Sequence, residues 1–149
     1  MTTNQDVIEC LMCLNKHLMP QGTVILELPH PSEIFAMVDC TRNGWEVPLV
    51  DENGEESGKL KVVWGDDDDE FDPIAQVRQF SVAMELEGAE EPQSIRETVP
   101  LRLFTTQEVD ALARCAGFSV KRMYGALDAD VSVDDEEEAF RMVCVLQKQ

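Results

Sequence analysis

The sequence predicts a mixed α/β fold built from two main helices with a β-rich segment between them. Apolar residues recur at helical spacing near both ends of the chain, whereas the middle alternates between apolar and polar residues as strands do. A length of 149 residues fits one domain, and a hydrophobic content of 44% can supply its core. We therefore expect residues 1–149 to form a single domain.

The first helix is expected over residues 5–19. Its apolar stripe consists of Val7, Ile8, Leu11, Met12, Leu14 and Leu18. Thr3 or Asn4 can cap the first turn by accepting a hydrogen bond from a free backbone amide. Pro20 and Gly22 then end the helix and turn the chain.

A short strand is expected over Thr23–Leu28, directly after this turn. The segment is almost continuously apolar, which is typical of a strand whose two faces are both covered. Pro29 and Pro31 lack backbone N–H groups, so they limit the hydrogen-bonded ladder beyond the strand. The residues that follow therefore form a loop at the carboxyl end of the strand.

The middle of the chain has the pattern of several strands separated by turns. The expected strands cover residues 45–50, 59–64, 77–86 and 95–104. Asp51–Gly54 has the composition of a hairpin turn, and an acidic loop with four consecutive aspartates covers residues 65–72. Pro100 limits the last of these strands to a sheet edge or interrupts it.

The second helix begins at a capping box formed by Thr105 and Glu108, whose side chains satisfy free amides of the first turn. Gly117 stands where a residue with left-handed geometry commonly ends a helix. Strands are expected over residues 118–124 and 139–146, with a second acidic loop at 128–138. Both helices and three of the strands thus come from the two ends of the chain.

Acidic residues dominate the charge of the chain, with 30 Asp and Glu against 12 Lys and Arg and a net charge of −18. This charge repels phosphate backbones and anionic headgroups, so neither a nucleic acid nor a membrane is an expected partner. It allows a cationic partner, although solubility alone also explains it. The five cysteines lack a disulfide-framework spacing, and neither a secretory leader nor a membrane span is predicted. We expect a reduced, intracellular and cytoplasmic protein, with an organelle address left open.

Metal and phosphate sites are not expected. Cys10 and Cys13 form a C-x-x-C pair, but no second pair completes a zinc site, and the pair lies inside a helix. Ordinary buried thiols are therefore the favoured interpretation of this pair, and equally of Cys40, Cys115 and Cys144. Counting calcium-loop positions from Asp128 puts Val133 where glycine is required and Ala139 where glutamate is required. Neither G-x-G nor G-x-x-x-x-G-K occurs, so no device for holding a phosphate or a nucleoside is recognised.

His30 is the main candidate for a functional side chain. It follows the carboxyl end of the predicted buried strand, where open α/β sheets bind ligands. A neutral imidazole there can accept a proton or orient a substrate. An exposed loop histidine without a role is the competing interpretation. Glu33 and Trp45 are weaker candidates for substrate contact, since a hairpin tryptophan packs against its sheet more often than it stacks on a ligand.

Two motifs resemble class I S-adenosylmethionine-dependent methyltransferases of the type 11/12-like group. Residues 18–22, LMPQG, are similar to the L-x-P-G-G turn that leads into the fifth strand of that family, with Gln21 replacing one glycine. Residues 104–109, FTTQEV, and 116–118, AGF, are similar to its F-T-x-E-E-L…A-G-F signature. Their order along the chain matches the second half of the family fold.

The resemblance covers about residues 5–35 and 100–147 and implies an incomplete Rossmann-like sheet. The three strands outside the middle would be its strands five and six and an antiparallel strand seven. Residues 36–104 would be a β-rich insertion, which in this family often covers the methyl acceptor. Family members hold S-adenosylmethionine with residues of strands one to four, so no cofactor-binding residue carries over onto this sequence.

The resemblance implies methyl transfer from S-adenosylmethionine to a small-molecule acceptor by a completed protein, without a metal. This sequence would be a domain truncated at its N-terminus and inactive alone. His30 would act as a base or orient the acceptor, and Glu33 and Trp45 would contact it. One alternative is a non-catalytic binding or regulatory subunit that pairs with a partner chain through the sheet edge that strand four normally covers. The other alternative is a gene-model or splice fragment with no independent role.

Overall fold

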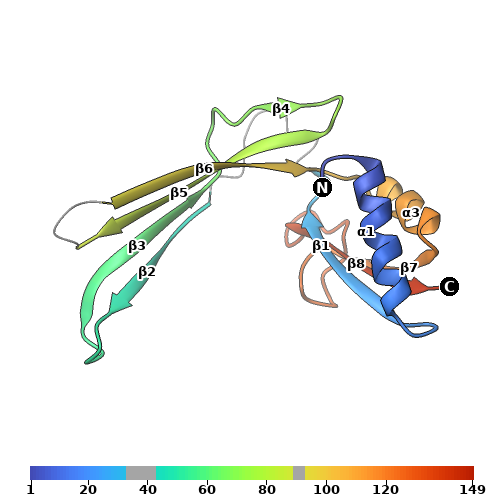
Figure 1. The fold of residues 1–149 in the computed structure, drawn as a ribbon, viewed down its shortest axis with the longest axis horizontal. Helices are drawn as coiled ribbons and strands as arrows, with labels where there is room; N and C mark the ends of the chain where they lie inside the picture. Colours follow the sequence, from blue (N-terminus) through green and yellow to red (C-terminus); the bar gives the residue numbers. More distant parts are fainter. Residues whose placement is uncertain (33–42, 89–92) are drawn as a thin grey trace. The chain divides into compact units, whose positions relative to one another are not determined.

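The computed structural model describes residues 1–32, 43–88 and 93–149 and divides the chain into two compact units (Figure 1). The first unit comprises Met1–Met37, Pro73–Val77 and Arg102–Gln149, and the second comprises Val38–Asp72 and Arg78–Leu101. Each unit has a sheet of its own, with three strands in the first and five in the second. The described helices and sheets confirm the mixed α/β class, and the expected single domain stays a prediction.

Helix α1 spans Asn4–His17 and begins at a capping box formed by Thr3 and Asp6. Thr3 Oγ1 accepts a hydrogen bond from the Asp6 amide at 3.2 Å, and the Asp6 carboxylate accepts one from the Thr3 amide at 3.3 Å. The helix ends two residues earlier than the sequence predicts. Leu18 is already extended, with a ψ of 144°, and Pro20 disfavours a return to helical geometry at Met19.

The sheet of the first unit has the order β1-β8-β7, and β8 is antiparallel to both neighbours. Strand β1 spans Thr23–Pro29, β7 spans Phe118–Tyr124 and β8 spans Arg141–Lys148. Thr23 pairs with Gln147 at one end of the ladder, and Pro29 pairs with Arg141 at the other. Strands β1 and β7 therefore run parallel to each other on opposite sides of β8.

Helix α3 spans Thr106–Cys115 and begins at the capping box that the sequence predicts. Figure 1 shows α1 and α3 side by side, packed against the sheet of the first unit. The buried core consists of Leu11, Phe104, Val109, Leu112, Ala113, Ala116, Phe118, Met142, Cys144 and Leu146. Fully burying a large apolar side chain contributes roughly 1.5–3 kcal/mol, so this layer holds the unit together. Within the described ranges, neither helix is long and apolar enough to cross a membrane.

Strand β1 does not have both faces covered, which corrects the expectation from its apolar sequence. Val24 and Leu26 reach the core beneath the helices. Ile25, on the other face, is 66% exposed, and Glu27 beside it is also exposed. An apolar sequence indicates that both faces of a strand favour burial. The described helices of this unit pack on one face of the sheet only, so the other face of β1 stays exposed.

Side chains from other elements close the C-terminal ends of both helices. Lys148 Nζ, on β8, donates to the carbonyl oxygens of Asn15 at 2.7 Å and Leu18 at 2.9 Å. Asn15 Nδ2 donates to the carbonyl oxygens of Ala116 and Gly117, each at 3.1 Å. Gly117 has a φ of 80°, the left-handed geometry that its place after the helix predicts. These bonds satisfy carbonyl groups that helix ends leave without partners, and they join α1, α3 and β8.

The sheet of the second unit has the order β2-β3-β5-β4, and β6 also pairs with β5. Its strands are β2 Asn43–Val50, β3 Glu56–Trp64, β4 Phe71–Asp72, β5 Val77–Glu87 and β6 Gln93–Arg102. Strands β2 and β3 form the predicted hairpin, and the Asp51 carboxylate closes its turn by accepting hydrogen bonds from the amides of Asn53 and Glu55. Pro100 lies within β6 and does not interrupt it. This sheet is separate from that of the first unit.

Candidate functional site

The loop at the end of β1 holds both ring nitrogens of His30. Nε2 lies 2.8 Å from the carbonyl oxygen of Val133, and Nδ1 lies 2.7 Å from Ser32 Oγ. Nδ1 also accepts a hydrogen bond from the Ser32 backbone amide at 3.2 Å. Because a carbonyl oxygen can only accept, the proton of the neutral ring is assigned to Nε2, and Nδ1 is the acceptor.

This arrangement determines what His30 can do chemically. The basic lone pair is on Nδ1, and the Ser32 hydroxyl donates to it. A proton that reaches Nδ1 from a ligand therefore passes through the Ser32 hydroxyl or displaces it. The pair can orient a substrate hydroxyl or amine and take up its proton. The Nε2 bond to Val133 also ties the end of β1 to the loop between β7 and β8.

Carboxylates organise the loop between β7 and β8 that His30 contacts. The Asp135 carboxylate accepts hydrogen bonds from the backbone amides of Glu138 at 2.8 Å and Glu137 at 2.9 Å. These two bonds, the Glu138 bond first, hold the pKa of Asp135 below its ordinary value. The acidic loop that the sequence predicts is therefore an internally bonded segment, and it presents the Val133 carbonyl to the imidazole.

The structure describes one of the other two predicted site residues. Glu33 lies within residues 33–42, outside the described residues. Trp45 lies on β2 in the second unit, pairs with Val62 of β3 and is 48% exposed. The described geometry thus assembles His30 with Ser32 and Val133, and the roles of Glu33 and Trp45 stay predictions.

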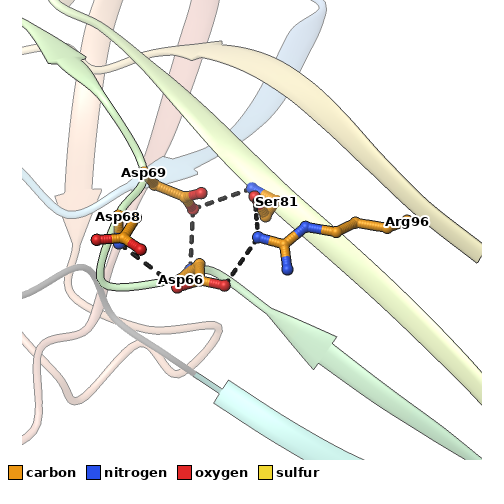
Figure 2. Close-up of polar contacts among 5 residues, drawn as sticks. All are labelled: Asp66, Asp68, Asp69, Ser81 and Arg96. Atoms are coloured by element: carbon orange, nitrogen blue, oxygen red, sulfur yellow. Dashed lines mark hydrogen bonds and ion pairs between the residues drawn. The ribbon is translucent and has the colours of Figure 1, made fainter.

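Two of the four consecutive aspartates, Asp66 and Asp69, are bonded to the sheet of the second unit (Figure 2). Asp69 Oδ2 accepts hydrogen bonds from the backbone amides of Asp66 at 3.0 Å and Ser81 at 2.9 Å. Arg96 Nη2 lies 2.8 Å from Asp66 Oδ2 and donates to Ser81 Oγ at 3.2 Å. These carboxylates hold the loop against β5 and β6. No sequence pattern predicts the role of Arg96, because strand pairing brings it to an aspartate 30 residues away.

Glu108 is more than the helix cap that the sequence predicts. Its Oε2 accepts hydrogen bonds from the Thr105 amide and from Gln76 Nε2, both at 2.9 Å, and its Oε1 lies 3.4 Å from Arg102 Nη2. Burial raises the pKa of Glu108, but the bonds from Thr105 and Gln76 and the charge of Arg102 outweigh it, and the pKa is lowered. Arg102 is buried, with its guanidinium carbon 4.8 Å from the Phe104 ring centroid. Arg102 and Phe104 are two positions apart on an extended segment, which puts their side chains on the same side, and this spacing is visible in the sequence.

Four of the five cysteines are described, and all four are free thiols. Cys13 and Cys115 are exposed, so the expectation of buried thiols is wrong for them; both lie on the helices, whose outer sides face solvent. Cys144 is completely buried, and burial raises its pKa to about 11. In the parts of the chain that the structure describes, no three His, Cys, Asp or Glu side chains are grouped to hold a metal ion.

Solved structures of S-adenosylmethionine-dependent methyltransferases share this fold. The CcbJ methyltransferase from Streptomyces caelestis matches 100% of this chain and 56% of its own, with a TM-score of 0.66 and 17% identity. CalS10, an amino pentose methyltransferase from Micromonospora echinaspora, matches 100% and 53%, with a TM-score of 0.66 and 18% identity. A methyltransferase from Clostridium acetobutylicum matches 98% and 52%, with a TM-score of 0.69 and 9% identity.

The chain therefore has a methyltransferase-like α/β fold. This chain spans about half the length of the matched structures. Comparison with protein-family models and with curated protein sequences found no match. At identities this low, the likeness concerns the fold, and the activity has to be argued from the chain's own residues.

Proposed function

We propose that this chain is the acceptor-side half of an S-adenosylmethionine-dependent methyltransferase, which methylates a small molecule once a cofactor-binding half is present. The observation that carries this proposal is the strand arrangement of the first unit, with β8 antiparallel between β1 and β7. The resemblance implies a fifth strand, then a sixth and an antiparallel seventh, and the three strands have these relative directions. Coverage of only about half of each matched methyltransferase supports the same assignment.

In this proposal, β1, β7 and β8 are strands five, six and seven of an incomplete Rossmann-like sheet. The second unit falls within residues 36–104 and is the insertion that covers the acceptor. S-adenosylmethionine would supply an activated methyl group. The residues present do not fit a cofactor grip, because the sequence contains neither G-x-G nor G-x-x-x-x-G-K. We therefore assign this chain to acceptor binding and proton uptake, and not to cofactor binding.

His30 and Ser32 serve the acceptor in this mechanism. Orientation of the acceptor supplies most of the rate in a reaction of this type. A protonated amine has no free lone pair, so it must lose a proton before its nitrogen can attack a methyl group. Nδ1 of His30 accepts a hydrogen bond from the Ser32 hydroxyl, which can hand on the proton of a bound amine or hydroxyl. Glu33 and Trp45 stay predicted acceptor contacts.

Amino sugars are the acceptor class to test first. The matched CalS10 is described as an amino pentose methyltransferase, and KedS8 from a Streptoalloteichus species as a sugar N-methyltransferase. The net charge of −18 also favours a cationic amine over an anionic acceptor. Both observations concern the acceptor and leave the position of its reacting nitrogen open.

Binding of amino sugars to the isolated chain tests the acceptor role. Saturation-transfer NMR with a panel of amino pentoses and amino hexoses should detect binding. We expect His30→Ala to weaken it by about tenfold or more, the effect of losing one good hydrogen bond. His17→Ala is the matched control, because that imidazole bonds the Cys13 carbonyl on α1. Equal affinity in the His30 variant, or no binding by any amino sugar, would refute the acceptor assignment.

A second function is favoured by the outer edge of β1. Among the described residues β1 pairs with β8 alone, so the backbone groups along its other side can accept another strand. Ile25, 66% exposed on the face of this strand, would then lie beside the side chains of the partner strand. The chain would then be a non-catalytic subunit docked on a catalytic one. The acceptor test separates the two functions, since a docking subunit need not bind an amino sugar.

Calorimetry with S-adenosylmethionine tests what both functions have in common. We expect no measurable binding to the isolated chain, because it lacks a recognisable cofactor motif. Stoichiometric binding would show that the chain holds the cofactor by itself, and both proposals would then fail.

A further inference from the structure

The sheet of the second unit has one apolar and one charged face. Directly paired residues share a face, so the register sorts the side chains into rows. The apolar rows across β2, β3 and β5 are Trp45, Val62, Met84 and then Val47, Leu60, Leu86. The rows of the opposite face are Glu46, Lys61, Glu85 and then Pro48, Lys59, Glu87. Lys59 Nζ lies 3.1 Å from Glu46 and 3.2 Å from Glu87, so Lys59 forms ion pairs with both neighbouring strands on that face.

The outer part of the apolar face is open to solvent, whereas Val62, between Trp45 and Met84, is only 5% exposed. Trp45 is 48% exposed, Val47 41% and Met84 40%. The described elements of the second unit are all strands, so its described residues supply no helix to cover the face. A soluble chain seldom leaves a contiguous apolar patch of this kind uncovered unless something binds it.

Strand β6 extends the same face. Arg96 donates to Ser81 Oγ, and Ser81 lies on the charged face because it alternates with Glu85 along β5. Alternation along β6 then puts Ile95, 63% exposed, and Val99, 38% exposed, on the apolar face. With these side chains the face offers roughly 600 Å² per molecule, so two such faces would bury about 1,200 Å², the lower end of stable interfaces.

Both outer strands of this sheet oppose pairing along their edges. Pro48 interrupts the row of N–H groups on β2, and Pro100 does so on β6. Among the described residues β2 pairs with β3 and β6 pairs with β5, so these two edges are outermost. Prolines at such edges block the addition of a further strand. A partner is therefore expected on the face of the sheet rather than at its edge.

We propose that this apolar face binds the same face of a second copy of the chain, forming a homodimer with the two sheets packed face to face, in which Trp45 contacts the second copy rather than an acceptor. Charge favours this occupant, because the six residues of the two rows are all uncharged in a chain of net charge −18. Two copies can meet along these two rows without opposing like charges, whereas the acidic surface elsewhere repels. If the two-fold axis runs parallel to the strands, the Trp45 ring of one copy lies against the flexible Met84 side chain of the other.

Glu97 puts one negative charge on the proposed dimer interface, and substitution can remove it. It alternates with Ile95 and Val99, so it lies on the apolar face at the outer strand β6. In the dimer this carboxylate loses water, and its charge opposes association. Salt would strengthen the dimer by screening the repulsion between two acidic chains. A basic foreign partner would instead be released by salt, so the salt dependence distinguishes the two occupants.

Sedimentation velocity of the full chain over a range of micromolar concentrations tests the proposal. We expect a monomer–dimer equilibrium whose Kd falls as salt rises. Trp45→Lys and, independently, Met84→Lys should each raise the Kd by about tenfold or more, because each buries an unpaired charge. Leu127→Lys, at a side chain 72% exposed in the first unit, is the matched control and should leave the Kd within about twofold.

Glu97→Gln covers the case in which the lysine variants do not fold. It should lower the Kd by removing the opposing charge, with far-UV circular dichroism unchanged. A chain that stays monomeric at the highest concentration, as it would if another protein or the rest of this chain covered the face, overturns the proposal. So does a dimer that none of the three face variants changes.

Discussion

Replacing Asn15 should reveal how strongly the two helix ends depend on a single side chain. Its amide donates two hydrogen bonds, to the carbonyl oxygens of Ala116 and Gly117, each at 3.1 Å. Each such bond contributes about 1 kcal/mol, so Asn15→Ala should lower the free energy of unfolding by about 2 kcal/mol. Asn15→Asp keeps the shape but points a carboxylate oxygen at the two carbonyls, and it should lower that free energy further.

Urea unfolding followed by far-UV circular dichroism measures the loss of stability in the first unit, which contains Asn15. Both described helices, α1 and α3, belong to the first unit, so the helical signal reports that unit. Both tryptophans of the chain, Trp45 and Trp64, lie in the second unit, and their fluorescence should keep its wild-type midpoint if the units unfold independently.

Gln5→Ala on the same helix provides the control. Gln5 bonds Glu9 at 2.7 Å on the exposed side of α1, and losing such a surface pair should cost less than about 0.5 kcal/mol. The reasoning is wrong if Asn15→Ala costs no more than Gln5→Ala. It is also wrong if Asn15→Asp is as stable as Asn15→Ala, because the geometry then does not require a donor at this position.

Three further predictions concern a carboxylate, a thiol and a turn. The lowered pKa of Glu108 stabilises the fold at pH values above the ordinary carboxyl pKa of 4.5, and that contribution is lost as the pH falls through the folded-state pKa. Glu108→Gln should therefore be less stable than the wild type near neutral pH. Urea unfolding at several pH values should show this difference in stability disappearing below about pH 4.5, and a constant difference would contradict the prediction. Iodoacetamide should label Cys13 and Cys115 in the native chain and spare Cys144, whose pKa is about 11; mass spectrometry showing native labelling of Cys144 would mean that the core opens. Gly88→Ala would put a Cβ 2.8 Å from a backbone carbon of β3 at a φ of 97°, so tryptophan fluorescence should show a loss of about 1–3 kcal/mol in the second unit, and wild-type stability would contradict it.

Local signals in the sequence predicted the elements well. The capping box of α3 needs only Thr105 and Glu108, three positions apart, and the hairpin between β2 and β3 needs only the turn at Asp51–Gly54. The predicted end of α1 is two residues too late, because the apolar stripe continues to Leu18, where the backbone is already extended ahead of Pro20. Such features depend on a few neighbouring residues, which the sequence displays directly.

Contacts between distant segments could not be predicted in the same way. The sequence indicates His30 as a candidate functional residue because it follows a strand. Its hydrogen bond to the Val133 carbonyl, however, joins residues 103 positions apart. The pairing of Arg96 with Asp66 and the uncovered face of β1 likewise follow from which strands become neighbours. Sequence patterns identify side chains that need a partner or a cover, and only the assembled sheets show which segment provides it.

The middle position of β8 has a consequence for how the first unit forms. Strands β1 and β7 make no ladder with each other, and each pairs with β8, the strand made last. Closing the β1 ladder joins Thr23 to Gln147, which requires ordering a long stretch of chain before any bond is gained. During synthesis, β1 and β7 therefore wait with apolar side chains exposed until β8 arrives. Loss of residues 141–148 would leave both strands unpaired, so a short deletion there should abolish this sheet as a whole.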